Sequence, residues 1–386
     1  MNIILTRTAK VKLNIKPEDV APTVEAYTTA YNHVCEVGWN DKDSNGVSLH
    51  HKTYSYCRKL LPSQLSISAR TKATESLKSA KSLIKKGQKS SCPKSKKSSM
   101  RYDQNSYSIW FDRNEISIST VDGRKKTGFT SYKHFEKYVG WRRKSADLFI
   151  RNGKVFLAIV FEKEVDDQQK TSNVVGVDRG IKKIAVTSDN MFFGGNHTKV
   201  VTNRYRSLRK KLQSVGTQSA KRHLRKIREK ENRFRRDVNH CVSKKIVNSL
   251  PAGTVIAIED LKNIRKRSNK MRKEQRYWIN GWSFYQLENF LVYKAQNNGC
   301  YVEHVDARYT SQRCSECGHK ERGNRPKQSI FKCKKCGFQL NADLNSSRNI
   351  RKNYMDAKGY PCRAAVNQPI VENEVTKHRK VNCATV

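Results

Sequence analysis

The hydrophobic pattern of the N-terminal part of the chain changes its period twice. Apolar and polar side chains alternate over residues 3–13, which predicts a β-strand. From 16 to 86 the apolar positions recur every three or four residues, which predicts amphipathic helices. Alternation returns over 107–120 and 148–161, where an Asn-Gly dipeptide at 152–153 predicts a tight hairpin turn. We therefore expect a β domain of about 165 residues that a helical segment interrupts.

Two polar stretches separate these patterns from their surroundings. Residues 85–101 are rich in Ser and Lys and include Gly87 and Pro93, so they offer too few apolar side chains to form a core of their own. We expect a mobile basic linker there. The second stretch, 166–172, predicts the junction between the two halves of the chain.

The C-terminal half mixes short strands with longer helices. Its apolar runs and helical periods predict, in order, strands at 174–180, 182–187 and 191–195, a long basic helical segment at 203–250, a strand at 255–258, a helix at 282–298 and a strand at 301–305. The first three strands form a meander whose first strand carries a single acid, Asp178. This succession differs from the interrupted β domain and indicates a second fold.

The charge balance indicates a polyanionic partner. The 386 residues include 78 lysines and arginines against 34 acidic residues, a formal charge of +44 at pH 7. A compact protein with that surplus repels itself, and nucleic acid is the partner that neutralises it most simply. The length allows two or three domains.

The sequence predicts a protein of a reducing compartment. It contains no run of 18 apolar residues, and the first 14 residues do not have the pattern of a secretion signal. The 11 cysteines are an odd number, and most are scattered. We expect a soluble protein that is not secreted and has no membrane partner.

Cysteines form the most specific motif. Cys314-x2-Cys317 and Cys333-x2-Cys336 are separated by 15 residues, and a glycine follows each pair. Two such turns can bring four thiolates to one tetrahedral Zn²⁺ ion, and because all four ligands are cysteines the ion would be structural. The alternative, two disulfides, needs an oxidising compartment.

Three acidic residues lie at or near the ends of predicted elements. Asp178 stands in an apolar strand, Glu259 ends another strand, and Asp343 precedes a helix predicted at 344–350. Each acid alone could equally end a strand or cap a helix. Together, three carboxylates suit hard cations with oxygen ligands, and two-metal phosphodiester cleavage requires such a set. Asp178, Glu259 and Asp343 are therefore the candidate catalytic residues and the candidate ligands of two Mg²⁺ ions.

The segment 204–236 is the most basic part of the chain and has only two acids, Glu229 and Glu231. A solvated helix face normally mixes both signs of charge, so the pattern favours a surface that follows phosphates. The candidate nucleic-acid contacts are Arg209, Lys210, Arg222, Arg225, Arg233, Arg235 and Arg236.

A second basic stretch, 265–276, predicts a mobile loop over the site of the acids. Three aromatic residues, Tyr277, Trp278 and Trp282, follow it. Such side chains stack on nucleotide bases, but these could equally belong to the core.

Five motifs in the second half resemble a known family. They are Gly-Val-Asp-Arg-Gly-Ile-Lys at 176–182, Ile-Glu-Asp-Leu at 258–261, Tyr-Thr-Ser-Gln-x-Cys-x-x-Cys-Gly at 309–318, Phe-x-Cys-x-x-Cys-Gly at 331–337 and Asp-Leu-Asn-x-x-x-Asn-Ile at 343–350. In these motifs the chain resembles the TnpB family, the RNA-guided nucleases encoded by bacterial and archaeal insertion sequences, which are related to the compact type V CRISPR effectors. The resemblance covers about 171–351, and the first half is similar only in layout.

The resemblance implies an α+β multidomain fold. A wedge-like β-barrel with a helical recognition insert would precede an RNase H-like (RuvC) nuclease domain that contains a zinc ribbon. The expected boundaries are 1–15 and 100–168 for the barrel, 16–99 for the helical insert with its basic linker, 171–306 and 341–352 for the nuclease domain, 307–340 for the ribbon, and 353–386 for a C-terminal tail of a kind that is disordered in some family members.

The resemblance also implies a function and a location in the prokaryotic cytoplasm, with the nucleoid when the protein is bound to DNA. The expected protein is an RNA-guided DNA endonuclease of a mobile element, monomeric with its guide RNA, which acts on double-stranded and single-stranded target DNA with a structural Zn²⁺ ion and two catalytic Mg²⁺ ions. Its basic surface would hold a guide–target heteroduplex through the backbone. The alternatives are a miniature type V CRISPR effector, a non-cutting guide-directed repressor or RNA-binding zinc-ribbon protein, and a strand-joining transposase.

Overall fold

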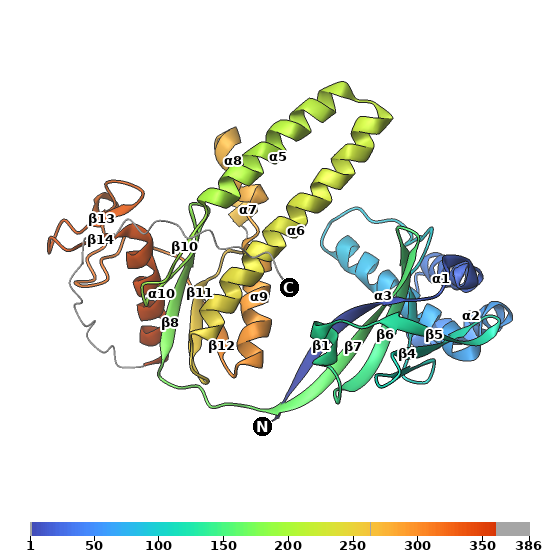
Figure 1. Ribbon diagram of the computed structural model, residues 1–386. Coiled ribbons are helices and arrows are strands. Elements are labelled where there is room, and N and C mark those ends of the chain that lie inside the picture. The colour runs from blue at the N-terminus through green and yellow to red at the C-terminus, as the bar shows by residue number, and fades with distance from the viewer. Residues whose placement is uncertain (1, 263, 360–386) are drawn as a thin grey trace. The chain divides into compact units, whose positions relative to one another are not determined.

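The computed structural model describes residues 2–262 and 264–359, apart from the side chains of Asn2 and His134. The chain divides into two compact units, Met1–Asp167 and Gln168–Val386 (Figure 1). The part of the predicted tail beyond residue 359 lies outside the described residues. Among the described residues, no helix has the length and apolar content that a membrane span needs.

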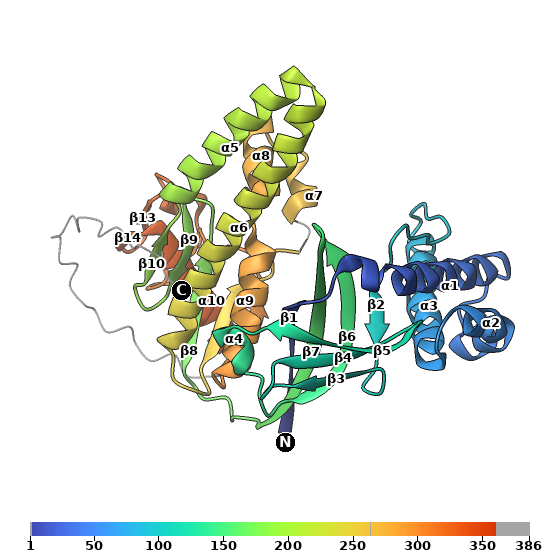
Figure 2. The ribbon, with the colours of Figure 1, turned by 45° about the vertical axis from the view of Figure 1, so that its right-hand side comes forward.

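The first unit is built on one seven-stranded antiparallel sheet that forms a nearly closed barrel (Figure 2). Its strands are β1 (Asn2–Leu13), β2 (Met100–Tyr102), β3 (Tyr107–Trp110), β4 (Glu115–Thr120), β5 (Gly123–Thr130), β6 (Arg142–Arg151) and β7 (Lys154–Asp166), in the spatial order β2-β6-β7-β1-β5-β4-β3. The predicted hairpin turn is confirmed, because Asn152 and Gly153 both have positive φ and join β6 to β7.

Helices interrupt this sheet between its first two strands. They are η1 (Pro17–Asp19), α1 (Ala21–Asn40), α2 (Gly46–Leu60) and α3 (Ser63–Lys85), and a short helix, α4 (Lys133–Glu136), follows β5. The Asn45 side chain caps α2 by accepting a hydrogen bond from the backbone N–H of Val47 at 2.8 Å. Apolar faces of these helices and of the sheet share one core, in which Tyr27, Leu77 and Leu157 are fully buried.

The basic stretch before β2 is attached to α1 and is not a free linker. Asn32 and Ser95 exchange two hydrogen bonds of 2.9 Å, and the Ser98 backbone N–H donates to the Thr28 hydroxyl at 2.9 Å. Its lysines remain exposed. The prediction of a mobile linker was therefore wrong, because polar side chains of a distant helix satisfy a segment that has no apolar core of its own.

The second unit contains a five-stranded sheet in the order β10-β9-β8-β11-β12. Its strands are β8 (Val174–Arg179), β9 (Lys183–Thr187), β10 (Phe192–Gly194), β11 (Val255–Glu259) and β12 (Tyr301–Val305). Strands β8, β9 and β10 form the predicted antiparallel meander, and β11 runs parallel to both β8 and β12.

Helices cover both faces of this sheet (Figures 1 and 2). They are α5 (Asn196–Val215), α6 (Gln218–Asn248), α7 (Ile264–Ser268), α8 (Lys273–Gly281), α9 (Phe284–Asn297) and α10 (Ala342–Lys358). Val175 and Val177 pack with α6 and α9, whereas Val174 packs with α10 on the opposite face. Gly176 also faces α10, where a side chain would collide with the backbone of Ser347.

Three predicted elements differ from the observed ones. The helical segment at 203–250 is two antiparallel helices, because Gly216 has a left-handed φ of 67° and Thr217 caps the second helix. The predicted mobile loop at 265–276 contains most of α7 and the first turn of α8. Helix α10 continues past 350 until Gly359, which ends it with a φ of 67°.

The last part of this unit is a small module with little regular structure. It contains η2 (Arg322–Asn324) and a two-stranded hairpin of β13 (Ile330–Lys332) and β14 (Gln339–Asn341), immediately before α10. The predicted α+β class, with a nearly closed barrel and a four-cysteine module, is confirmed.

Candidate active site and zinc centre

Asp178 and Glu259 are neighbours because they end adjacent parallel strands. Val177 of β8 is paired with Ile258 of β11, so the next residue on each strand is one of the two acids. Side chains alternate between the faces of a sheet, which places both acids on the face covered by α10. The sheet register therefore brings together two residues that are 81 positions apart.

Asp343 reaches the same place from the first turn of α10. The cap of this helix is Asn341, whose side-chain oxygen accepts hydrogen bonds from the backbone N–H groups of Asp343 at 3.0 Å and Leu344 at 3.3 Å. Asp343 is therefore not the N-cap, and its carboxylate is available for another role.

The pKa of Asp178 depends on the other two carboxylates. Burial, together with the negative charges of Glu259 and Asp343, raises the pKa of Asp178 to about 8. Burial also raises the pKa of Glu259, although a hydrogen bond from Thr310 opposes the rise. Three such acids cannot all ionise cheaply unless a cation joins them, so their chemistry fits divalent metal ions with oxygen ligands.

Three further residues at the acids were not predicted from the sequence. The Thr310 hydroxyl donates to Glu259 Oε1 at 2.5 Å, and Arg325 Nη2 donates to Asp343 Oδ1 at 3.0 Å. The buried Arg179 donates to the backbone oxygen of Glu259 at 2.6 Å and to the Glu288 carboxylate at 2.7 Å. Thr310 and Arg179 lie inside the motifs that resemble TnpB, whereas Arg325 lies in an irregular loop with no local signal.

The four predicted cysteines form one cluster. All four Sγ atoms lie within 4.8 Å of one another, and no other group of three or more such ligand residues is that compact among the described residues. The backbone N–H of Gly318 donates to Cys314 O, and that of Gly337 donates to Cys333 O, both at 3.0 Å. These two matching turns and their free thiols could bind a zinc ion.

Electrostatics favour a thiolate at one of these cysteines. Burial opposes ionisation of Cys333. Hydrogen bonds from the backbone N–H groups of Cys336 and Lys335 stabilise the thiolate, and the pKa of Cys333 is lowered to about 6. A thiolate is the form of cysteine that binds metals.

Helix α10 holds the module of the four cysteines against the carboxylates. Asn345 accepts a hydrogen bond from the Ser315 backbone N–H at 3.0 Å and donates to Arg313 O at 2.8 Å. Asn349 donates to the backbone oxygens of Thr310 at 2.8 Å and Arg313 at 2.6 Å. Both asparagines are fully buried. The cysteine module and the acidic site are therefore mechanically connected through one helix.

The predicted basic contacts fall into two groups. Five of them are exposed on α5 and α6, namely Lys210, Arg222, Arg225, Arg233 and Arg236. Arg209 and Arg235 instead form ion pairs with Glu231, which is buried inside the helix pair. The sequence could not distinguish the two groups, because the pairing depends on which residues of α5 and α6 face each other.

Comparisons with known proteins agree with this arrangement. The family model described as "Probable transposase" matches residues 158–269, and the one described as "Cas12f1-like, TNB domain" matches residues 284–350. The "CRISPR-associated endodeoxyribonuclease Cas12f1" of Sulfoacidibacillus thermotolerans is 41% identical over 129 residues, which are 33% of this chain and 29% of that protein. A TnpB-like protein of Methanocaldococcus jannaschii is 33% identical over 138 residues, 36% of this chain and 49% of that protein.

A further relative from Escherichia coli K12, named "Putative RNA-guided DNA endonuclease InsQ", is 30% identical over 249 residues, 58% of this chain and 60% of that protein. The chain is therefore similar to TnpB-like and Cas12f proteins over parts of its length. The chain thus spans between 29% and 60% of the length of these curated relatives.

A solved structure shares the fold of this chain. The cryo-EM structure of a Cas12f1–sgRNA–target DNA complex matches with a TM-score of 0.64 at 16% identity, over 86% of this chain and 81% of that chain. At this identity the match shows a shared fold. The roles of the individual side chains rest on the geometry described above.

Proposed function

We propose that this chain is an RNA-guided DNA endonuclease associated with a mobile element. The observation that carries the proposal is the convergence of Asp178, Glu259 and Asp343 on one face of the sheet, with the pKa of Asp178 raised to about 8 by burial and its acidic neighbours. Relatives named as endodeoxyribonucleases and as an RNA-guided endonuclease support the reaction class.

The three carboxylates would hold two Mg²⁺ ions. Asp178, Asp343 and Glu259 would supply the carboxylate oxygens that bind them. When bound, the metals supply an activated water molecule and stabilise the leaving oxygen of the phosphodiester. Thr310 keeps the Glu259 carboxylate in place through its hydrogen bond, and Arg325 provides a positive charge beside Asp343.

The zinc module would support this site without taking part in the reaction. Four cysteines leave no ligand position for water, so the Zn²⁺ ion would be structural. Thr310 precedes the first metal turn by four residues, and Arg325 lies between the two cysteine pairs. Loss of the metal would therefore release two of the residues that hold the catalytic carboxylates.

The basic surface would bind the nucleic acids. The exposed arginines and lysines of α5 and α6 can contact the phosphates of a guide RNA paired with target DNA without reading its bases. We propose a monomeric complex of protein and RNA in the prokaryotic cytoplasm that binds double-stranded target DNA and its separated strands. A miniature CRISPR effector would use the same residues with a guide from a different locus, and sequencing the RNA that copurifies with the protein distinguishes the two.

One comparison tests the catalytic assignment. Glu259→Gln and Asp260→Asn each replace a carboxyl group with an amide at neighbouring positions. The Asp260 carboxylate accepts a hydrogen bond from the backbone N–H of Lys262, and its pKa does not depend on Asp178 or Asp343. With guide RNA, matched plasmid and Mg²⁺, we expect Glu259→Gln, Asp178→Asn and Asp343→Asn to abolish cleavage while guided DNA binding stays within about twofold, and Asp260→Asn to cut normally.

The same assays distinguish the nuclease from a non-cutting binding protein. A wild-type protein that binds the guided target but does not cut it would favour a repressor. Cleavage that survives Asp178→Asn or Asp343→Asn would show that the catalytic residues are misassigned.

A further inference from the structure

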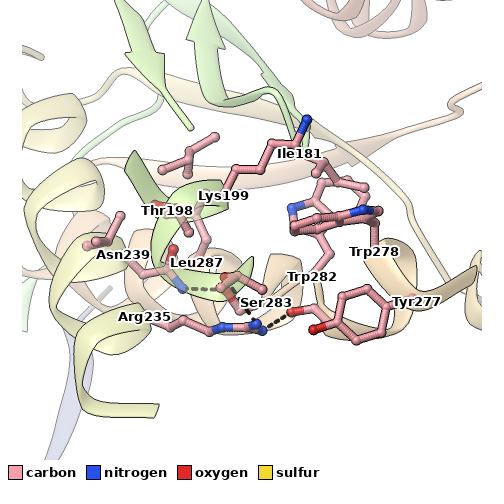
Figure 3. Close-up of a pocket in the computed structure, with 15 residues that line it drawn as sticks. Ile181, Thr198, Lys199, Arg235, Asn239, Tyr277, Trp278, Trp282, Ser283 and Leu287 are labelled. Carbon is pink, nitrogen blue, oxygen red and sulfur yellow. Dashed lines mark hydrogen bonds between the residues drawn. The ribbon is translucent and has the colours of Figure 1, made fainter. Parts of the chain in front are cut away.

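A pocket with aromatic walls lies next to the strand that carries Asp178 (Figure 3). Gly180 and Ile181, which follow this acid by two and three residues, form part of its lining. Figure 3 shows Trp278 and Trp282 at the same end of the pocket as Tyr277, and Lys199 is also part of the lining. The proposed metal chemistry makes no use of these side chains.

A larger cationic cavity of about 750 Å³ adjoins this aromatic pocket. It lies between α5, α6 and α8, and its basic lining residues are Arg206, Arg209, Arg225, Arg228, Arg235, Lys273 and Arg276. Glu231 is the single acid in the described lining, and it pairs with Arg209 and Arg235. Arg225, Arg228, Lys273 and Arg276 have no carboxylate partner in the described part of the chain. Such a cavity attracts phosphate groups.

The two hollows share a wall made of Arg235, Tyr277 and Gly281. Arg235 runs from α6 towards α8, donates to the backbone oxygen of Gly281, and retains a buried Nε–H without a hydrogen-bond partner. The Arg206 guanidinium lies 4.2 Å from the centre of the Tyr277 ring, and Arg209 donates to the Tyr277 hydroxyl at 3.2 Å. The shared wall is therefore held in position from both helices.

We propose that the aromatic pocket and the cationic cavity form one site for an unpaired nucleotide of a DNA strand. The base would stack on Trp278 and Trp282 across the mouth of the aromatic pocket, and the flanking phosphates would enter the cationic cavity. The inference rests on the proposed nuclease function, which supplies the DNA strand as the ligand. The pocket lies on the face of the sheet covered by α6 and α9, and the carboxylates lie on the face covered by α10.

The dimensions and chemistry select a single strand. The aromatic pocket encloses only about 60 Å³, so a base can lie against its rings but cannot enter it completely. In a duplex both faces of each base are covered by its neighbours, and only an unpaired base can offer a face to an indole ring. An aromatic cluster that merely docked α8 would not need a cavity lined by seven cationic side chains beside it.

A comparison of two strands with equal charge isolates the base contact. Full-length zinc-bound protein is titrated, without Mg²⁺ or guide RNA, with labelled oligothymidylate of about 12 nucleotides and with an abasic strand of the same length. We expect the wild-type protein to bind the thymidylate strand about 5- to 100-fold more tightly. Trp278→Leu with Trp282→Leu should reduce this ratio at least fivefold, whereas the corresponding double Phe variant should retain most of it.

Controls separate stacking from folding and from charge. Tyr285→Leu removes an exposed aromatic ring of α9 outside the pocket and should leave the ratio unchanged. Arg225→Gln with Arg228→Gln should weaken both strands alike and reduce the slope of log affinity against log salt by about two. Thermal unfolding of each variant shows whether the fold is intact, and an oligouridylate strand measures whether RNA uses the same site.

An unchanged ratio in the double Leu variant with intact folding would overturn the nucleotide site. Equal affinity of the wild-type protein for the thymidylate and abasic strands would overturn it as well. Because these titrations involve neither guide RNA nor cleavage, a protein that failed to cut guided targets would refute the proposed function while leaving the measured ratio valid.

Discussion

Replacing Asp178 with Asn should stabilise the metal-free protein at neutral pH. The substitution keeps the shape of the side chain and removes a carboxyl group whose pKa is about 8 in the fold, because of its burial and the charges of Glu259 and Asp343. An unfolded Asp has a pKa of about 3.9. Folding therefore imposes a proton, or an unfavourable charge, on this residue at pH 7, and an amide avoids both.

The sign and size of the effect follow from linkage. Below about pH 4 Asp178 is protonated in both states, so it causes no penalty. The penalty grows as the pH rises and is complete above the folded pKa of about 8. At pH 7 it is at most roughly 4 kcal/mol, and because three acids share the repulsion we expect about 1–4 kcal/mol. For a unit of this size that corresponds to an increase in Tm of roughly 2–15 °C.

Thermal unfolding between pH 4 and 8.5, with and without Mg²⁺, measures this prediction. The Tm difference between Asp178→Asn and wild type should grow with pH in the absence of Mg²⁺, and added Mg²⁺ should raise the Tm of the wild type more than that of the variant. Asp260→Asn is the control, since the backbone N–H of Lys262 lowers the pKa of Asp260 and its loss should not stabilise the fold. A variant less stable than wild type at pH 7, or a difference independent of pH, would refute the electrostatic reasoning.

Three other predictions address the zinc module, the positioning of Glu259 and the basic surface. Cys333→Ser should reduce the zinc content from about one ion per chain to near zero and destabilise the protein, and elemental analysis showing no zinc in the wild type would contradict the assignment. Thr310→Val should slow guided cleavage roughly tenfold. It should also move the acid limb of the pH–rate profile to higher pH, because the lost hydrogen bond normally lowers the pKa of Glu259. An unchanged profile would show that Thr310 does not position Glu259. RNA should copurify with the protein, and its affinity should fall by orders of magnitude over a few-fold increase in salt, so a flat salt titration would exclude the phosphate-binding surface.

The sequence by itself determined the features that depend on local spacing. Each CxxC turn is closed by a hydrogen bond between residues four positions apart, so the local sequence is enough to predict its geometry. Strand alternation and helical period predicted the main elements of both units, and the motifs around the acids indicated the similarity to TnpB-like proteins. These signals are reliable because each depends on neighbours within a few positions.

Tertiary structure decided which distant residues meet. The parallel pairing of β8 with β11 places Asp178 beside Glu259, and the packing of α10 adds Asp343 and the buried asparagines that fasten the zinc module. Arg209 and Arg235 lie in the same basic sequence pattern as the exposed arginines near them. In the fold, however, both form ion pairs with Glu231, which is buried between the helices. Arg325 has no local signal at all, since only the fold of the zinc module carries it to Asp343. Such contacts depend on the register and packing of whole elements, which no short stretch of sequence specifies.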